Sequence, residues 1–217
     1  MARRYFGTDG VRGVFGEDLT PLFVERLGRA ATLWCGGGGV FIGRDTRASG
    51  PTLERAFASG VASAGGNAVL AGVLPTPAVA LLRQDLGVVI SASHNPPEYN
   101  GVKFFDRRGR KLTDADEEEI EQLLGAPPRS PEQGRIDNIE VALGSYLDHV
   151  LERFGSDLSG LKIAVDCANG SYSAIAPTTF EQLGAEVTAI AANPDGQNIN
   201  VGCGATDLSL LQRTVLE

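Results

Sequence analysis

The sequence contains little cysteine and histidine, and it contains no long apolar run. Its three cysteines, Cys35, Cys167 and Cys203, are odd in number and widely spaced. A disulfide framework needs paired cysteines, and a structural zinc site needs ligands at short, regular spacings. Both are therefore excluded, and three reduced thiols indicate a cytoplasmic protein.

Membrane segments and a strongly basic surface are also missing. No apolar stretch approaches the ~18 residues of a membrane helix, and the basic N-terminus lacks the apolar core of a signal peptide. Lysine and arginine number 19 against 27 aspartates and glutamates, which gives a net charge of −8. We therefore expect neither a nucleic-acid nor a membrane partner, although a local basic pocket can still bind a small anion.

Several common catalytic motifs do not occur. Gly-x-Ser-x-Gly is absent, and the only histidines are His94 and His149, so neither a nucleophile elbow nor a Ser-His-Asp triad is supported. The glycines at 36–39 precede a strand, whereas a nucleotide-binding loop lies between a strand and a helix. The acidic residues of 114–119 fall in the first turns of a helix, where their charge interacts favourably with the helix dipole, so a metal site is not needed to explain them.

What the sequence does contain is a regular alternation of strands and helices. Short apolar runs at 40–43, 68–71, 88–90, 102–105, 161–166 and 187–191 alternate with helical patterns. The expected helix caps are Thr20, Ser49 and Thr113, and Thr76-Pro77 is expected to open a further helix. The alternation predicts an α/β fold with a mixed or mostly parallel sheet.

The domain organisation follows from length and composition. We expect one complete domain over 1–155 and an incomplete second domain over 156–217. Residues 126–138, rich in proline and polar groups, read as a surface linker. The second domain has only about sixty residues, which is small for an independent core. A last helix, capped by Thr206, runs on without a stop signal, so we expect the chain to be a fragment of a longer protein.

The strongest candidate for chemistry is Ser93. It follows an apolar strand, and a hydroxyl at a strand end with polar groups and a cation nearby is a plausible nucleophile. His94 and Asn95 adjoin it, and Lys103 can return to the same edge through the turn at 100–101. Taken alone, a serine after a strand is more often a turn residue.

Arginines form the second group of candidates. Arg12, Arg44 and Arg47 lie on glycine-flanked or strand-end loops and can be either solvated charges or bidentate phosphate ligands. Ligands of α/β proteins gather at the carboxyl ends of strands, and Arg44, Ser93 and Asn169 all follow predicted strands. These residues are therefore expected at one edge of the sheet.

Five segments of the chain resemble the phosphohexomutases. They are Phe-Gly-Thr-Asp-Gly-Val-Arg-Gly at 6–13, Ser-Ala-Ser-His-Asn-Pro at 91–96, Asn-Gly-Val-Lys-Phe-Phe at 100–105, Asp-Cys-Ala-Asn-Gly at 166–170 and Pro-Asp-Gly-Gln-Asn-Ile-Asn at 194–200. The Ser-His-Asn-Pro loop is very specific to this superfamily, and the resemblance spans the whole chain. It implies domains in which a mixed, mostly parallel sheet is sandwiched between helices.

The resemblance also implies an activity. It points to the branch that interconverts glucosamine 6-phosphate and glucosamine 1-phosphate, on the route to UDP-N-acetylglucosamine and the cell wall. The serine matching Ser93 is phosphorylated in that family and makes a sugar 1,6-bisphosphate intermediate. Lys103 and Arg12 are then expected to line the phosphoserine site, with Lys103 assisting proton transfer, while His94, Asn95 and Arg44 shape the loop or bind phosphate.

Cofactor and assembly are implied in the same way. One Mg2+ is expected on the phosphoserine oxygen of Ser93 and on three aspartates of a loop beyond residue 217. Since the sugar and phosphate loops of the family also lie beyond it, we expect this chain to be inactive alone. A homodimer is implied for the longer protein. The alternatives are a phosphoglucomutase or phosphomannomutase, or a non-catalytic module that carries a phosphoserine and binds sugar phosphates.

Overall fold

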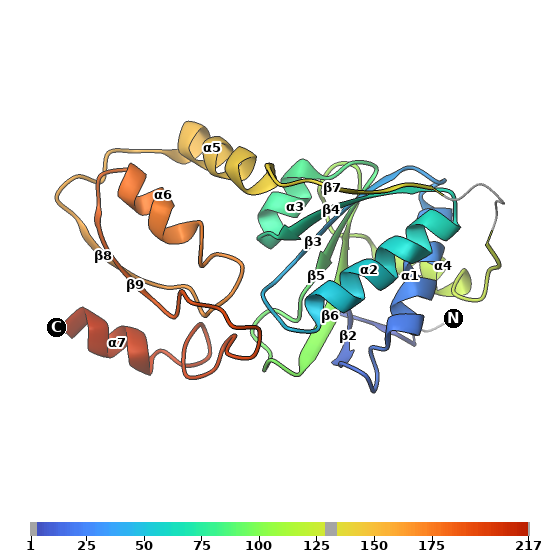
Figure 1. Ribbon diagram of the computed structural model, residues 1–217, viewed down its shortest axis with the longest axis horizontal. Coiled ribbons are helices and arrows are strands. Elements are labelled where there is room, and N and C mark those ends of the chain that lie inside the picture. Colours follow the sequence, from blue (N-terminus) through green and yellow to red (C-terminus); the bar gives the residue numbers. More distant parts are fainter. Residues whose placement is uncertain (1–3, 129–133, 217) are drawn as a thin grey trace.

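The larger of two β-sheets in the chain has seven strands, within the computed structural model that describes residues 4–128 and 134–216. In spatial order they are β1 (Phe6–Gly7), β2 (Gly10–Val14), β6 (Tyr99–Phe105), β5 (Leu86–Ile90), β3 (Gly39–Arg44), β4 (Asn67–Val73) and β7 (Ile136–Asn138). Strands β5, β3, β4 and β7 run parallel, and β6 is antiparallel to its neighbours β5 and β2. The expected mixed, mostly parallel sheet is confirmed (Figure 1).

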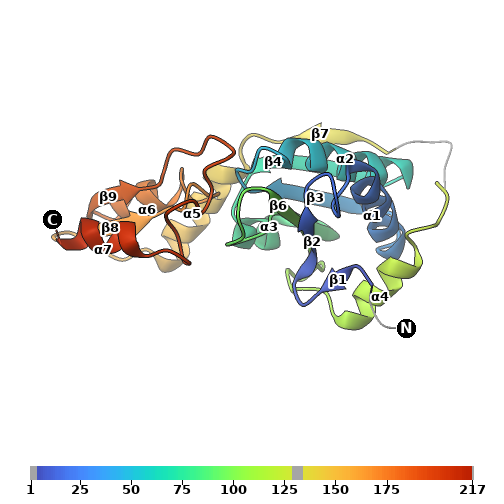
Figure 2. The same ribbon diagram turned by 90° about the horizontal axis from the view of Figure 1, so that it is seen from below.

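Helices cover both faces of this sheet. α1 (Pro21–Trp34) and α2 (Gly50–Ser63) pack on one face, α3 (Thr76–Leu82) and α5 (Ala142–Phe154) on the other, and α4 (Asp114–Gln122) lies against α1 (Figure 2). Val40 and Ile42 of β3 pack under α1 and α2, while Phe41 faces α3. Successive strand residues point to opposite faces, so burial of both faces explains the uninterrupted apolar runs.

Two of the expected helix caps form as the sequence indicates. The Thr20 hydroxyl accepts a hydrogen bond from the backbone N–H of Phe23 at 3.2 Å, and α1 begins at the next residue, Pro21. Thr113 forms a reciprocal capping box with Asp116 at the start of α4. Each cap satisfies a backbone donor that the helix itself leaves unpaired.

The prediction that Ser49 caps α2 is wrong in its chemistry. The helix does begin at Gly50, but the Ser49 side chain makes no capping bond. Its hydroxyl instead accepts a hydrogen bond from the buried Asn100 amide at 2.8 Å. Asn100 also accepts from the N–H of Gly101, so this pair ties the start of α2 to the start of β6.

The linker expected at 126–138 is also corrected in part. Residues 136–138 form β7, which adds to the sheet in parallel beside β4, with Ala68 opposite Ile136. Residues 129–133 lie outside the described residues. The composition of this stretch does not predict the edge strand, because the three residues of β7 are exposed and show no alternation of apolar and polar side chains.

A second, smaller sheet follows α5. It consists of the parallel strands β8 (Lys162–Asp166) and β9 (Glu186–Ile190), with α6 (Ala176–Gln182) between them in the chain and α7 (Ser209–Leu216) after them (Figure 1). The last helix begins at Ser209 rather than after Thr206, because Asp207 accepts hydrogen bonds from the N–H and hydroxyl of Ser209. Across residues 4–128 and 134–216, the helices are too short or too polar to cross a membrane.

The close packing of α1 against α2 depends on glycine. A Cβ at Gly28 of α1 would clash with the carbonyl oxygen of Phe57 in α2, and one at Gly60 of α2 would clash with the carbonyl oxygen of Glu25. Backbone atoms cannot move aside as a side chain can. The two helices therefore approach closely only because both positions lack a side chain.

We expect Gly28→Ala to lower the free energy of unfolding by about 1–3 kcal/mol, since the added methyl group overpacks the contact between α1 and α2. Urea denaturation followed by circular dichroism measures this change. The matched control is Gly144→Ala in α5, where a Cβ meets open space and helix propensity predicts a gain of roughly 0.5–1 kcal/mol. A Gly28→Ala variant as stable as the wild type would contradict this packing.

Candidate active site around Ser93

Ser93 lies just beyond the end of β5, exposed and in an unusual backbone conformation. Its φ is 56°, in the left-handed region that residues with a side chain rarely adopt. Such a conformation costs roughly 1–2 kcal/mol and persists only where surrounding contacts hold it. The loop around Ser93 therefore needs an anchor.

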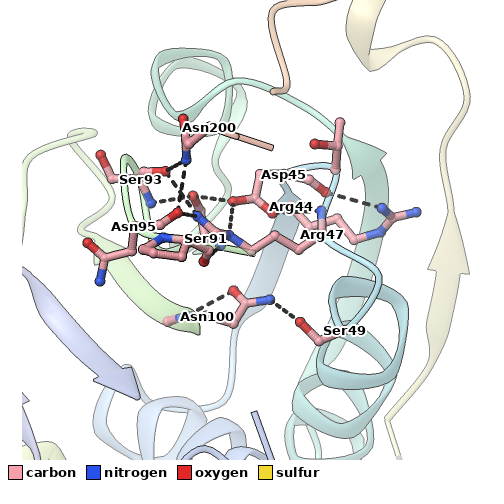
Figure 3. A network of polar contacts seen from close by, with 12 residues as sticks. Arg44, Asp45, Arg47, Ser49, Ser91, Ser93, Asn95, Asn100 and Asn200 are labelled. Carbon is pink, nitrogen blue, oxygen red and sulfur yellow. Dashed lines mark hydrogen bonds and ion pairs between the residues drawn. The ribbon is translucent and has the colours of Figure 1, made fainter. Parts of the chain in front are cut away.

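The anchor is Arg47, whose side chain is completely buried. Its Nη2 donates hydrogen bonds to the carbonyl oxygens of Ser93 at 3.0 Å and Asn95 at 2.8 Å, and its Nη1 donates to that of Pro96. Figure 3 shows the guanidinium reaching under the serine loop. The fixed fork of guanidinium donors suits this task, because one group satisfies three carbonyls that point the same way.

Asp45 completes the anchor and connects it back to the serine. Arg47 donates through Nε to the Asp45 carboxylate at 2.9 Å, and the Ser91 hydroxyl donates to the same oxygen at 2.7 Å. The N–H of Ser93 in turn donates to the Ser91 hydroxyl at 3.0 Å. The buried charge is thus paired and fully hydrogen-bonded, the condition under which a buried ion pair is tolerated.

The smaller sheet reaches the same loop through Asn200. Its Nδ2 donates to the carbonyl oxygens of Ser93 at 2.9 Å and Asn95 at 3.0 Å. These are the two carbonyls that Arg47 Nη2 also contacts. The shape of the serine loop is therefore set by both sheets together.

Two cations lie on the strands next to the serine loop. Arg12 of β2 is opposite Gly101 of β6, and Lys103 of β6 is opposite Val89 of β5. A Cβ at Gly101 would lie 2.9 Å from Arg12 Cγ and 2.8 Å from the carbonyl oxygen of Ser91. The stem of Arg12 thus lies directly beside the serine loop, over a position that must be glycine.

Asp9 is the shared partner of these cations. Its carboxylate lies 2.6 Å from Lys103 Nζ, 2.8 Å from Arg12 Nη2 and 3.8 Å from Lys111 Nζ. Burial works to raise the pKa of Asp9, but the hydrogen bond and charge of Lys103, helped by both other cations, outweigh it and leave the pKa below its ordinary value. Three positive groups around one carboxylate make this corner locally basic on an acidic protein.

The structure does not bring Arg44 to the serine loop. Its Nε contacts the Glu54 carboxylate at 3.2 Å and its Nη1 donates to the carbonyl oxygen of Asp45 at 3.2 Å. Burial raises the pKa of Glu54 even though the charge of Arg44 opposes that change. Asn95 joins the site through its backbone carbonyl, and the exposed His94 lies at the loop surface.

A cavity of about 550 Å³ lies between the serine loop and the smaller sheet. Its lining combines the serine loop, the end of β8 and α7: Ser93, His94, Ala164, Val165, Asp166, Cys167, Ala168, Tyr172, Ala176, Asn200, Gly204, Ala205, Leu208 and Leu211. It is large enough for a small phosphorylated ligand. The exposed hydroxyl-bearing residue therefore faces a space into which a substrate can fit.

No group of three or more His, Cys, Asp or Glu side chains suited to a metal ion occurs in the described ranges 4–128 and 134–216. Near Ser93, the carboxylate of Asp45 is already occupied by Arg47 and Ser91. The described residues beside Ser93 thus offer no ready-made cluster of carboxylates for Mg2+.

The sequence names Ser93, Lys103 and Arg12 as candidates, and the structure adds the residues that arrange them. Arg47 was considered only as a surface charge or a phosphate ligand, and it is neither. Asp9 and Asn200 were noticed only inside longer motifs. A usable signal existed in Asp45-Thr-Arg47, an acid and a base two residues apart directly after a buried strand.

We expect the Asp9 carboxyl to titrate below the ordinary pKa of about 3.9, and Lys103→Met to raise that pKa by removing its closest cation. Because the folded-state pKa is lowered, the stability that this pair contributes is present above pH ~4 and is lost as pH falls through the folded-state pKa. Carboxyl carbon NMR measures the titration. Lys162→Met, which removes an exposed partner of Glu186 at 3.6 Å, is the control and should leave Asp9 unchanged. An Asp9 pKa at its ordinary value would contradict the cluster.

Comparison with known proteins places this geometry in a family. Residues 3–128 match the family model of phosphoglucomutase/phosphomannomutase, alpha/beta/alpha domain I. The phosphoglucosamine mutase of Moorella thermoacetica is 47% identical over 98% of this chain and 51% of its own length. That of Pseudomonas aeruginosa is 46% identical over 100% of this chain and 52% of its own length.

Solved structures agree with the fold. A phosphoglucomutase/phosphomannomutase family protein from Burkholderia thailandensis superposes with a TM-score of 0.79 at 29% identity, over 89% of this chain and 45% of its own. The N-acetylphosphoglucosamine mutase of Aspergillus fumigatus, solved with GlcNAc-6P and magnesium, shares the fold with a TM-score of 0.51 at 17% identity, over 97% of this chain and 45% of its own. The chain spans about half the length of the curated relatives it matches. It belongs to the phosphoglucomutase/phosphomannomutase family.

Proposed function

We propose that these residues form the phosphoserine-bearing part of a cytoplasmic phosphoglucosamine mutase, which interconverts glucosamine 6-phosphate and glucosamine 1-phosphate. The observation that carries the proposal is the presentation of Ser93. The buried guanidinium of Arg47 holds its backbone in the left-handed conformation, with the side chain exposed beside a cavity. A turn serine needs no such anchor, whereas a group that must meet a substrate repeatedly in one geometry does.

The reaction is two phosphoryl transfers through the same serine. In the first, the bond between phosphorus and the Ser93 oxygen breaks as a bond forms to the C1 hydroxyl oxygen of glucosamine 6-phosphate. The sugar hydroxyl loses its proton, the serine oxygen gains one, and the product is the 1,6-bisphosphate. In the second transfer the 6-phosphoryl group returns to Ser93 and releases glucosamine 1-phosphate. Such transfers depend on in-line positioning and on stabilising the charge of the phosphoryl oxygens.

Arg12 and Lys103 supply that positive charge. Both lie on strands adjoining the serine loop and share the carboxylate of Asp9. A phosphoryl group on Ser93 adds a dianion for which these cations become hydrogen-bond donors. Lys103 carries an ammonium proton on a flexible stem, so it is the residue proposed to exchange a proton with the Ser93 oxygen.

The other candidate residues and the metal ion have auxiliary roles in this proposal. His94 and Asn95 border the cavity or the loop and are proposed to contact the phosphoryl group. Arg44 is paired with Glu54, so this proposal assigns it no phosphate. Mg2+ would neutralise phosphoryl charge when bound. One oxygen of phosphorylated Ser93 can serve as a ligand, and aspartates of the longer protein are proposed as the other protein ligands.

The choice of glucosamine is supported by the curated relatives, which are phosphoglucosamine mutases at 46–47% identity. The runner-up within the family is a phosphoglucomutase or phosphomannomutase. A non-catalytic module that carries a phosphoserine is the alternative from another class. The separation of the two sheets supports the proposed division into 1–155 and 156–217. A homodimer of the longer protein stays a prediction.

The test uses a protein that begins with these residues and continues to the length of its relatives, called the extended protein below. Intact mass after purification, or after incubation with a glucosamine 1,6-bisphosphate, should show one phosphoryl group, mapped by peptide analysis to Ser93. Glucosamine 6-phosphate should remove it faster than glucose or mannose 6-phosphate does. Ser93→Ala should carry no phosphate and lose turnover by a factor of at least ~10³, since the neighbouring Ser91 hydroxyl is already bonded to Asp45.

Controls separate the alternatives. Ser171→Ala changes an ordinary turn serine and should keep both the phosphate on Ser93 and the turnover. The isolated 217-residue chain is expected to show no turnover. Faster removal by glucose or mannose 6-phosphate would assign the runner-up. An extended protein in which Ser93 carries no phosphate and accepts none would contradict the mutase proposal and favour the binding module.

A further inference from the structure

We propose that Asn200 is a positioning residue for phosphoryl transfer, one that makes the shape of the Ser93 loop depend on the smaller sheet. The proposal rests on the proposed function and deepens it. The observation behind it is that two donors, in loops that follow strands of the two different sheets, bond to the same pair of carbonyl oxygens.

The convergence is specific. Arg47 Nη2 and Asn200 Nδ2 each lie within 3.0 Å of both Ser93 O and Asn95 O. Arg47 belongs to the loop after β3, in the larger sheet, whereas Asn200 belongs to the loop after β9 (Figure 3). Each carbonyl oxygen has two lone pairs, so both donors can be satisfied at once.

Asn200 is itself held firmly in place. Its φ is 60°, and its N–H donates to the carbonyl oxygen of Ala168 at 2.9 Å. The preceding residue, Ile199, is buried. The adjoining turn is closed by Asn169, which donates to the carbonyl oxygen of Asn198 and accepts from the N–H of Asn193. The backbone of Asn200 is thus held by its surroundings, and its amide reaches the serine loop through its bonds to the carbonyl oxygens of Ser93 and Asn95.

These bonds restrict where the Ser93 oxygen can lie. Holding the carbonyl of Ser93 fixes the peptide plane on one side of its Cα, and the bond from its N–H to Ser91 fixes the other. The direction of the Cα–Cβ bond is then determined, and the hydroxyl oxygen is limited to the few staggered positions around that bond. A displacement of about 1 Å at a reacting group can cost on the order of a hundredfold in rate.

A simpler role, holding the two sheets together, is already filled by other bonds. Thr46 Oγ1 donates to the carbonyl oxygen of Asn169 at 2.5 Å, and the N–H of Ala48 donates to that of Gly196 at 2.8 Å. Neither bond involves the residues of the serine loop. Thr46→Val therefore removes a contact between the sheets at Asn169 and leaves in place the two side chains that bond to the loop carbonyls, Arg47 and Asn200, so it is the matched control.

The first experiment is steady-state kinetics on the extended protein. Asn200→Gly removes the amide at a φ that glycine adopts freely, and Asn200→Asp keeps the size of the side chain but loses both N–H donors. We expect both variants to lower kcat by roughly tenfold to a hundredfold and to change KM by less than about twofold, because the transfer geometry suffers and substrate binding does not. Thr46→Val should change kcat by less than about twofold.

The second experiment needs no activity. Amide hydrogen exchange on the isolated chain reports on the N–H of Ser93, bonded to Ser91, and that of Asn95, bonded to the carbonyl oxygen of Ala92. Both amides should exchange at least about fivefold faster in Asn200→Gly than in wild type, because this variant loses the contacts to the loop. Their exchange should be unchanged in Thr46→Val, which keeps those contacts.

The outcomes separate this proposal from the proposed function. Faster loop exchange together with a fall in kcat supports the positioning role. Unchanged exchange in Asn200→Gly, an unchanged kcat, or an equal fall in Thr46→Val overturns it. If the wild-type extended protein neither turns over nor accepts phosphate on Ser93, the proposed function fails, and the exchange measurement alone decides whether Asn200 sets the loop.

Discussion

The buried pair of Arg47 and Asp45 is the interaction on which the rest of the site depends. A guanidinium that solvent cannot reach must donate its hydrogen bonds to protein oxygens. Arg47 donates to one carboxylate and to three carbonyls of the serine loop. The carbonyls therefore point inward, which turns the Ser93 side chain outward. Removing either charge would leave the other buried and unpaired, at a cost of about 3–5 kcal/mol. The loop shape is thus set by the core rather than by a ligand.

Around this pair, each element contributes one part of the proposed phosphoryl-transfer site. The antiparallel neighbours β2 and β6 present Arg12 and Lys103 side by side, with Asp9 as their common partner. Strand β5 ends three residues before Ser93, and the part of the chain from β8 onwards adds Asn200 and most of the cavity wall. Cations that already share a carboxylate can exchange it for a phosphoryl group with little reorganisation, which is the property that electrostatic stabilisation requires.

The sequence predicted what depends on local pattern. Apolar runs located the strands, the Thr20 and Thr113 caps located two helices, and the end of a buried strand located Ser93. It could not predict what depends on distant partners. Arginine is usually exposed, so burial of Arg47 is not expected from its residue type. The Ser49 hydroxyl bonds to Asn100 instead of capping its own helix, and Asn200 lies 107 residues from Ser93 in the chain. Apart from the local pattern at Asp45 and Arg47, spacing along one sequence carries no signal for such contacts.

Whether Ser93 carries the transferred group during turnover is tested most directly by rapid-quench kinetics. Phosphorylated extended protein is mixed with glucosamine 6-phosphate, and the phosphate remaining on Ser93 is followed by mass spectrometry within the time of one turnover. The account predicts that phosphate leaves Ser93, and appears in the bisphosphate, at least as fast as kcat. Loss of phosphate from Ser93 more slowly than kcat would contradict it, because a required intermediate cannot react more slowly than the whole cycle.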